Sequence, residues 1–229
     1  EESQLVITGH YSDGSIRDLT RAAEITSANE QVAVIQGSVV VPVGNGSTDI
    51  NIKVKGKKFS TTATISNQNK PQPVSFLYGT LAALSKNNCN AGACHGSPSG
   101  KAGFRLSLRA FDPKLDELTL IREDFGRRTN SLDADNSLLL LKPSMKVAHG
   151  GGRQIRSDDP AYAVVRDWIA EGCKMDAADV PRPVSIEVYA KSGRILEKPA
   201  FGQQISVWAH YSDGSVHDIT KMAVYTSSD

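Results

Sequence analysis

The sequence has 229 residues, of which 39% are hydrophobic, and its 26 Lys and Arg residues balance 25 Asp and Glu residues to a formal net charge of +1. That balance provides no strong field for nucleic acid or an anionic membrane surface, so nucleic acid is not expected as a partner. No apolar run approaches the roughly 20 residues that a transmembrane helix needs, and three cysteines are too few for a disulfide scaffold.

Short β-strands are predicted for the N-terminal segment. Leu5, Ile7 and Tyr11 alternate with their neighbours at the period of two that is typical of a strand. The following Ser-Asp-Gly-Ser, at 12–15, favours a hairpin turn, because Asp can bond its own backbone and Gly accepts a positive φ. Further strands are predicted over 32–35, 38–43, 49–54 and 60–65. This spacing predicts a small β-sandwich.

The N-terminal pattern recurs at the C-terminal end. Residues 5–29 laid over residues 205–229 give eleven identities in 25 positions, including His-Tyr-Ser-Asp-Gly-Ser from His10 and from His210. A strand over 184–189 precedes only the second copy, and the later strands follow only the first. We therefore expect a piece of a longer protein, cut at both ends. One copy could complete another chain's module by strand addition, which predicts strand-completing self-association.

Between the two β segments the apolar period becomes helical. Helices are predicted over 75–84, 115–122 and 138–141. The clearest helix starts after Asp158-Asp159-Pro160, an N-cap followed by proline in the first turn, and its apolar stripe ends near Gly172. The sequence therefore predicts a separate helical domain in the middle of the chain.

That domain carries the main chemical motif, in which Cys89 and Cys94 are followed directly by His95. Two thiols beside a histidine are the arrangement that attaches haem c, since the thiols add to the vinyl groups and the histidine reaches the iron. The usual spacer has two residues, whereas four small residues separate the cysteines here and require a bulged loop. The motif predicts one covalent haem with His95 as an axial ligand.

Other chemistries also fit this motif. Cys89 and Cys94 could form a disulfide, a thiol could act as a nucleophile paired with His95, or the three residues could bind zinc together with Cys173 or His149. The disulfide leaves the adjacent histidine unexplained, and the nucleophile lacks an orienting third group. Zinc does not by itself require an apolar helical pocket, whereas a large flat cofactor does, so the context favours haem.

The middle segment resembles the planctomycete-type cytochrome c domain over about residues 73–175. The resemblance rests on Cys-Asn-Ala-Gly-Ala-Cys-His-Gly at 89–96, Gly-Phe-Arg-Leu-Ser-Leu-Arg at 103–109, Phe-Asp at 111–112, Gly-Arg-Arg at 126–128, Ser-Leu-Leu-Leu at 137–140, Lys-Pro at 142–143 and His-Gly-Gly-Gly at 149–152. The Tyr-Ser-Asp-Gly-Ser turn and the strand spacing of the flanking segments resemble bacterial immunoglobulin-like domains of group 2.

These resemblances imply a multidomain fold, with an all-α cytochrome c-like haem domain at 70–180 between all-β immunoglobulin-like sandwich modules. The first module, at 1–69, lacks its first strand, and the second, at 181–229, is truncated.

The resemblance also implies site residues. It places His149 as the second axial ligand, with Met145 as the alternative. Phe104, Leu139 and Trp168 are predicted to pack against the haem, and Arg105 to pair with a propionate.

The predicted function is one-electron transfer within a larger periplasmic or secreted protein, toward a redox partner protein or domain. No catalytic residue is required, so we expect an electron carrier rather than a catalyst. Two alternatives stay open, namely a haem peroxidase or ligand-binding sensor, and a zinc-stapled adhesion module.

Overall fold

The computed structural model describes residues 1–70, 72–190 and 202–227. The chain divides into two compact units, of which unit 1 contains Glu1–Pro71 and Pro183–Lys221 and unit 2 contains Gln72–Arg182 and Met222–Asp229. The predicted domains also divide the chain near residues 70 and 181, but the structure groups both β segments in unit 1. Residues 71, 191–201 and 228–229, which the predicted domains include, lie outside the described residues.

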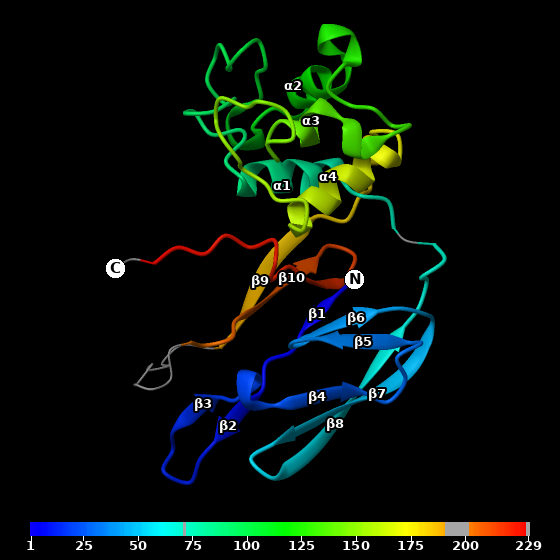
Figure 1. Ribbon diagram of the computed structural model, residues 1–229, viewed down its shortest axis with the longest axis vertical. Coiled ribbons are helices and arrows are strands. Elements are labelled where there is room, and N and C mark those ends of the chain that lie inside the picture. The colour runs from blue at the N-terminus through cyan, green and yellow to red at the C-terminus, as the bar shows by residue number, and fades with distance from the viewer. Residues whose placement is uncertain (71, 191–201, 228–229) are drawn as a thin grey trace. The chain divides into compact units, whose positions relative to one another are not determined.

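Unit 1 consists of short antiparallel strands (Figure 1). The strands of its N-terminal part are β1 (Ser3–Gln4), β2 (Thr8–His10), β3 (Ile16–Asp18), β4 (Glu24–Ser27), β5 (Ala33–Gln36), β6 (Val39–Pro42), β7 (Gly46–Val54) and β8 (Lys57–Ile65). They form the sheets β1-β6-β5 and β4-β7-β8 and the hairpin β2-β3. Buried side chains alternate with exposed ones along β7, and Ala33, Val40 and Ile50 form the core. The four predicted later strands are confirmed.

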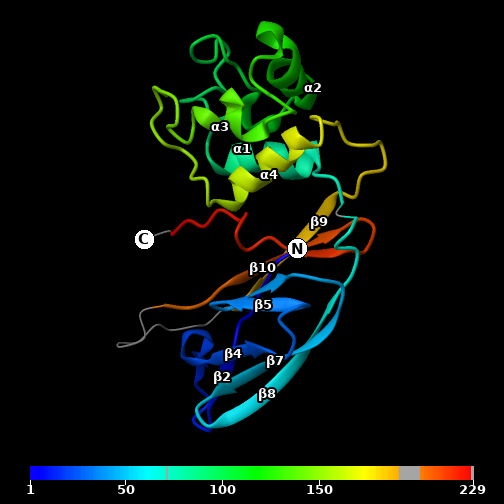
Figure 2. The same ribbon diagram turned by 45° about the vertical axis from the view of Figure 1, so that its right-hand side comes forward.

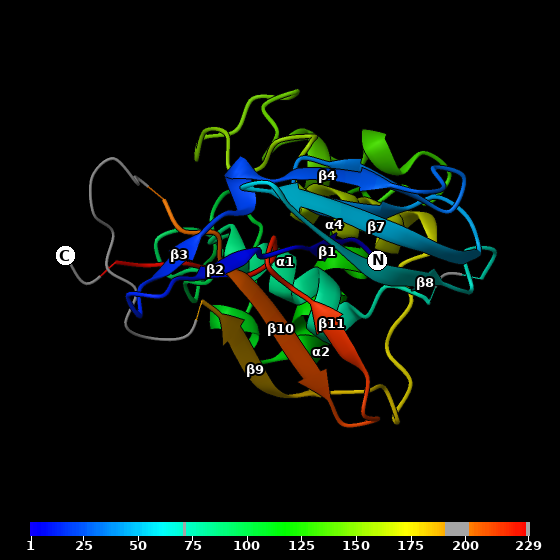
Figure 3. The same ribbon diagram turned by 90° about the horizontal axis from the view of Figure 1, so that it is seen from below.

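The C-terminal part of unit 1 repeats the hairpin. It contains β9 (Pro183–Tyr189), β10 (Ser206–Tyr211) and β11 (Val216–Asp218), with β10 between the other two strands (Figure 3). The amide of Tyr11 donates to the Ser15 carbonyl at 3.0 Å, and the amide of Tyr211 donates to the Ser215 carbonyl at 2.9 Å. The hairpin predicted from the repeat is therefore confirmed in both copies.

The two copies also contact each other through equivalent atoms. Asp18 Oδ2 accepts a hydrogen bond from the Gln204 amide at 2.6 Å, and Asp218 Oδ2 accepts one from the Gln4 amide at 2.5 Å. In each case an Asp carboxylate of one copy accepts a hydrogen bond from the backbone amide of a Gln residue in the other copy.

The described residues of unit 2 form four α-helices, α1 (Leu81–Lys86), α2 (Pro113–Glu117), α3 (Leu138–Leu141) and α4 (Pro160–Ala170). In α4, the Asp159 side chain accepts a hydrogen bond from the Ala161 amide at 2.9 Å, and Pro160 occupies the first turn, so the predicted cap is confirmed. α4 packs against α1 (Figure 2). α4 also contacts the helical turn before α1, where the rings of Trp168 and Phe76, both fully buried, lie 5.3 Å apart.

The predicted fold class, an all-α cytochrome c-like domain between all-β immunoglobulin-like sandwiches, is wrong. Over the described residues, strands make up 26% and helices 23%, and the longest α-helix has only 11 residues. The predicted helices do form, but as short pieces continued by π-helical turns at Phe76–Thr80 and Leu118–Arg122. Among the described residues, none of the helices is both long and apolar enough to cross a bilayer.

Local backbone geometry explains why the helices are short. Asn88, Ala102, Arg109 and Asp124 all have a positive φ, a conformation that no α-helix contains, and Gly and Pro residues punctuate the same loops. Short windows of apolar periodicity indicated where a helix begins. A residue with positive φ follows soon after each helix, namely Asn88 after α1, Asp124 after the π-helical turn that extends α2, Met145 after α3 and Cys173 after α4. The short antiparallel strands of unit 1 remain compatible with immunoglobulin-like modules.

Candidate functional site

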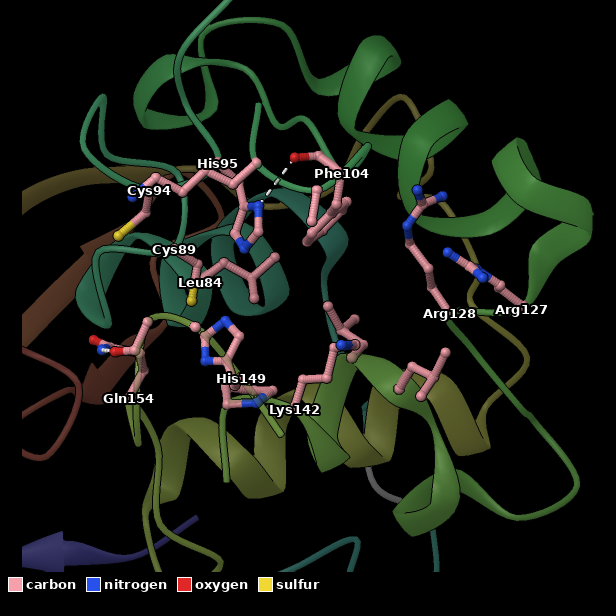
Figure 4. Close-up of a pocket in the computed structure, with 17 residues that line it drawn as sticks. Leu84, Cys89, Cys94, His95, Phe104, Arg127, Arg128, Lys142, His149 and Gln154 are labelled. Atoms are coloured by element: carbon pink, nitrogen blue, oxygen red, sulfur yellow. Dashed lines mark hydrogen bonds between the residues drawn. The ribbon is translucent and has the colours of Figure 1, made fainter. Parts of the chain in front are cut away.

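Unit 2 contains a cavity of about 530 Å³, within the range of about 300–1,000 Å³ that is typical of ligand pockets (Figure 4). It is lined by Leu84, Cys89, Cys94, His95, Lys101, Ala102, Phe104, Arg127, Arg128, Leu138, Leu139, Lys142, Pro143, His149, Gly150, Gly151 and Gln154. The lining therefore combines an apolar surface with both cysteines of the motif, two histidines and four cationic side chains.

The four-residue spacer of the cysteine motif folds as a compact turn. The His95 amide donates to the Cys89 carbonyl at 2.9 Å, and the Cys94 amide donates to the Ala91 carbonyl, also at 2.9 Å. Inside the turn, Asn90 is buried, and its side-chain amide donates to the Ser85 hydroxyl of α1 at 2.7 Å. These bonds hold Cys89 and His95 at fixed positions on the wall of the cavity.

The His95 ring is held as a neutral imidazole. Its Nδ1 lies 3.0 Å from the Phe104 carbonyl oxygen, and because a carbonyl can only accept, Nδ1 carries the hydrogen and Nε2 keeps its lone pair. Burial lowers the pKa of His95, outweighing the opposing effect of that hydrogen bond. A neutral ring with its second nitrogen bonded to a carbonyl is the state in which histidine binds metals.

The His149 ring has the same arrangement on another loop. Its Nδ1 lies 2.7 Å from the Gly152 carbonyl oxygen, so Nδ1 carries a hydrogen and Nε2 is the nitrogen left for a ligand. The centres of the two imidazole rings are 6.2 Å apart and their planes differ by 20°. The two histidine side chains are therefore close enough for one bound group to contact both of them.

The cysteines are free thiols in an environment that opposes ionisation. Burial, with a smaller effect from Cys94, raises the pKa of Cys89 to about 12. Only a thiolate is a good nucleophile, so this environment counts against an activated nucleophile at Cys89. A thioether at Cys89 would carry no charge, so burial would not disfavour it as it disfavours the thiolate.

The charged groups that line the cavity are all cationic. Lys101, Arg127, Arg128 and Lys142 belong to the lining, and no Asp or Glu does. Sequence reasoning missed all four as site residues, although Gly-Arg-Arg at 126–128 was part of the resemblance. A cavity of this kind suits an apolar ligand that carries acidic groups.

The structure brings together most of the residues predicted for the haem site, but not all of them. Phe104 and Leu139 line the cavity with Cys89, Cys94, His95 and His149. Trp168 is fully buried in the core and is not part of the lining.

The other two predicted positions also lie outside the lining. Arg105 has an exposed side chain that donates to the Pro98 carbonyl at 3.4 Å, and Met145, the alternative axial ligand, is 44% exposed.

The side chains of the cavity fit a haem better than a preformed site for a bare ion. The two imidazole rings lie 6.2 Å apart, and both thiols lie on one side of them (Figure 4). Among the described residues, no group of three or more His, Cys, Asp or Glu side chains is placed to hold a metal ion. A search against protein-family models found no match to the chain, and a search of curated proteins found none either.

Proposed function

We propose that this protein is a c-type cytochrome that transfers single electrons. Cys89 and Cys94 would carry one haem through thioether bonds, and His95 and His149 would be its two axial ligands. The observation that carries the proposal is the pair of imidazoles 6.2 Å apart across the cavity, each with Nδ1 against a backbone carbonyl. The resemblance to the planctomycete-type cytochrome c domain also supports it.

When bound, haem supplies a reversible one-electron couple between ferric and ferrous iron. The chain's contribution is to hold two imidazoles with fixed tautomers and to limit water around them. Leu84, Phe104 and Leu139 supply apolar surface to the same cavity. His95 and His149 would both hold the iron, and two histidine side chains on one iron favour electron transfer over peroxidase or sensor chemistry.

The remaining parts of the proposal concern location and partners. Thioether attachment of haem takes place outside the cytoplasm, so we place the protein in the periplasm or outside the cell. Its redox partner would be a domain elsewhere in a longer polypeptide or a separate protein. Strand-completing self-association through the β modules also stays a proposal.

The test is to express the chain with a cytochrome c maturation system and measure its intact mass and visible spectrum. We expect haem that survives acid-acetone extraction, and its loss in the Cys89→Ser, Cys94→Ser double variant. A bare polypeptide mass in the wild type would overturn the proposal. A colourless sample with stoichiometric zinc would favour the adhesion module instead.

A second comparison tests the axial ligands. His149→Ala is expected to convert a six-coordinate, low-spin spectrum to a high-spin one that binds added carbon monoxide. Met145→Ala is the matched control, because Met145 lies outside the cavity lining, and it should leave the spectrum unchanged. If Met145→Ala produces the high-spin form and His149→Ala does not, the assignment of His149 is wrong. A wild-type spectrum that is already high-spin would favour the peroxidase or sensor.

A further inference from the structure

Two consecutive arginines reach the cavity from a turn with unusual backbone geometry. Asp124, Phe125 and Gly126 have φ values of 52°, 61° and 68°, three left-handed residues in succession. The left-handed region is unfavourable for residues other than glycine, and such strain concentrates where a structure must place particular side chains. A Cβ on Gly126 would lie 2.9 Å from the Ile121 carbonyl oxygen, so this position also needs glycine for space.

Of the two arginines, Arg128 is the one that holds the loops together. Its side chain is 7% exposed, and its guanidinium donates to the carbonyls of Thr119, Glu123 and Gly103 at 2.8, 3.2 and 3.2 Å. It also donates to Asp124 Oδ2 at 2.6 Å. Four of its five N–H groups are therefore used inside the protein, so Arg128 has a structural role.

Arg127 is the arginine with capacity for a ligand. Its nearest acidic partner is Asp124, at 3.6 Å, which is longer than a hydrogen bond, and that carboxylate already accepts the short bond from Arg128. The Arg127 side chain is 65% exposed and lines the cavity. One carboxylate is thus shared by two guanidinium groups, and the Arg127 guanidinium keeps N–H groups that could donate to an acidic ligand.

The position of Arg127 indicates which acidic group it would meet. Figure 4 shows Arg127 and Arg128 on the side of the cavity away from the sulfur atoms of Cys89 and Cys94. In haem, the two pyrrole rings with vinyl groups lie opposite the two with propionates. Thioether bonds on the cysteine side would therefore turn the propionates toward the arginines.

We propose that Arg127 binds a propionate carboxylate of the haem, with Lys101 and Lys142 adding positive charge to the same cavity. This inference rests on the proposed function and assigns the orientation of the cofactor. A planar guanidinium can donate two parallel hydrogen bonds to a carboxylate, which Lys101 and Lys142 cannot do.

The test compares two ligands that differ only in their acidic groups. The full chain carrying Cys89→Ala and Cys94→Ala is titrated with ferric haem and with the dimethyl ester of ferric haem. The same titrations are repeated on the chain that also carries Arg127→Gln. We expect Arg127→Gln to weaken haem binding by about three-fold to ten-fold, as for a partly exposed charged hydrogen bond, and to leave ester binding unchanged. Arg105→Gln is the matched control, because Arg105 is outside the lining, and it should change neither.

Equal effects of Arg127→Gln on the two ligands, or no effect on either, would overturn the inference while leaving the proposed function intact. If neither ligand binds without the thioethers, the reduction potential of the matured holoprotein decides. There, Arg127→Gln should lower the potential relative to wild type and to Arg105→Gln, because a positive charge at the propionate stabilises ferrous iron. An unchanged potential would overturn the inference. Absence of haem from the matured wild-type protein would instead reject the proposed function.

Discussion

The side chain of Phe104 connects His95 to the rest of unit 2, so its removal is a direct test of how the site is held. The Phe104 ring centre lies 4.4 Å from the ring centre of His95. On the face of the Phe104 ring, the guanidinium carbon of Arg128 lies 4.9 Å from the Phe104 ring centre. The Phe104 carbonyl also accepts the hydrogen bond from His95. Phe104→Ala removes both ring contacts and keeps the carbonyl.

We expect Phe104→Ala to lower the free energy of unfolding of unit 2 by about 2–4.5 kcal/mol. The ring pair with His95 contributes about 0.5–1.5 kcal/mol, and the contact with Arg128 about 0.5–1 kcal/mol. Phe104 is half-buried, so the lost burial adds about 1–2 kcal/mol. The sum stays below the upper end of about 5 kcal/mol measured for fully buried phenylalanines.

The assay is urea unfolding of the haem-free chain, followed by tryptophan fluorescence in a Trp208→Phe background. That background leaves Trp168, which is fully buried in unit 2, as the only reporter. Phe125→Ala is the matched control, because Phe125 is fully exposed and should change the stability by less than about 0.5 kcal/mol. If Phe104→Ala costs no more than Phe125→Ala, Phe104 does not hold the site.

Two further predictions concern groups whose ionisation is opposed by burial. Asp116 is fully buried and accepts hydrogen bonds from the Ser107 amide and hydroxyl at 2.6 and 2.7 Å, yet burial raises its pKa. The folded state therefore keeps the Asp116 proton to higher pH than the unfolded chain does. The free energy of unfolding should fall as pH rises from about 3.8 through the pKa of Asp116 in the folded state. Urea titrations at several pH values should show that Asp116→Asn removes this fall. The same dependence of stability on pH in Asp116→Asn and wild type would contradict the prediction. The second prediction is that iodoacetamide at about pH 8 labels Cys94 well before Cys89. Burial raises the pKa of Cys89 to about 12, and only the thiolate reacts. Peptide mass spectrometry that finds equal labelling rates at the two cysteines would refute the reasoning.

Several features of this protein follow from local sequence alone. The turn after Tyr11 and its repeat after Tyr211 form because Asp13 and Asp213 each accept the amide hydrogen two residues ahead, at Ser15 and Ser215. The start of α4 likewise depends only on its own cap and proline. These interactions lie within a few residues, so the distant parts of the chain do not affect them.

Other features depended on packing that the sequence pattern does not contain. The apolar stripe of α4 showed that Trp168 is buried, but not that its neighbour is Phe76 rather than the cavity. The same limit explains the wrong fold class, because short periodic windows predict helical turns without showing that loops with positive φ separate them.

The amino-acid sequence by itself determined the cysteine–histidine motif, the repeated hairpin and the helix starts, since each is set by neighbouring residues. Only the tertiary structure decided that His149, from a separate loop, faces His95 at 6.2 Å and that Arg127 lines the same cavity. The reason is physical: a side chain's direction follows from its own backbone, whereas its partner across a cavity is fixed by how all the intervening segments pack.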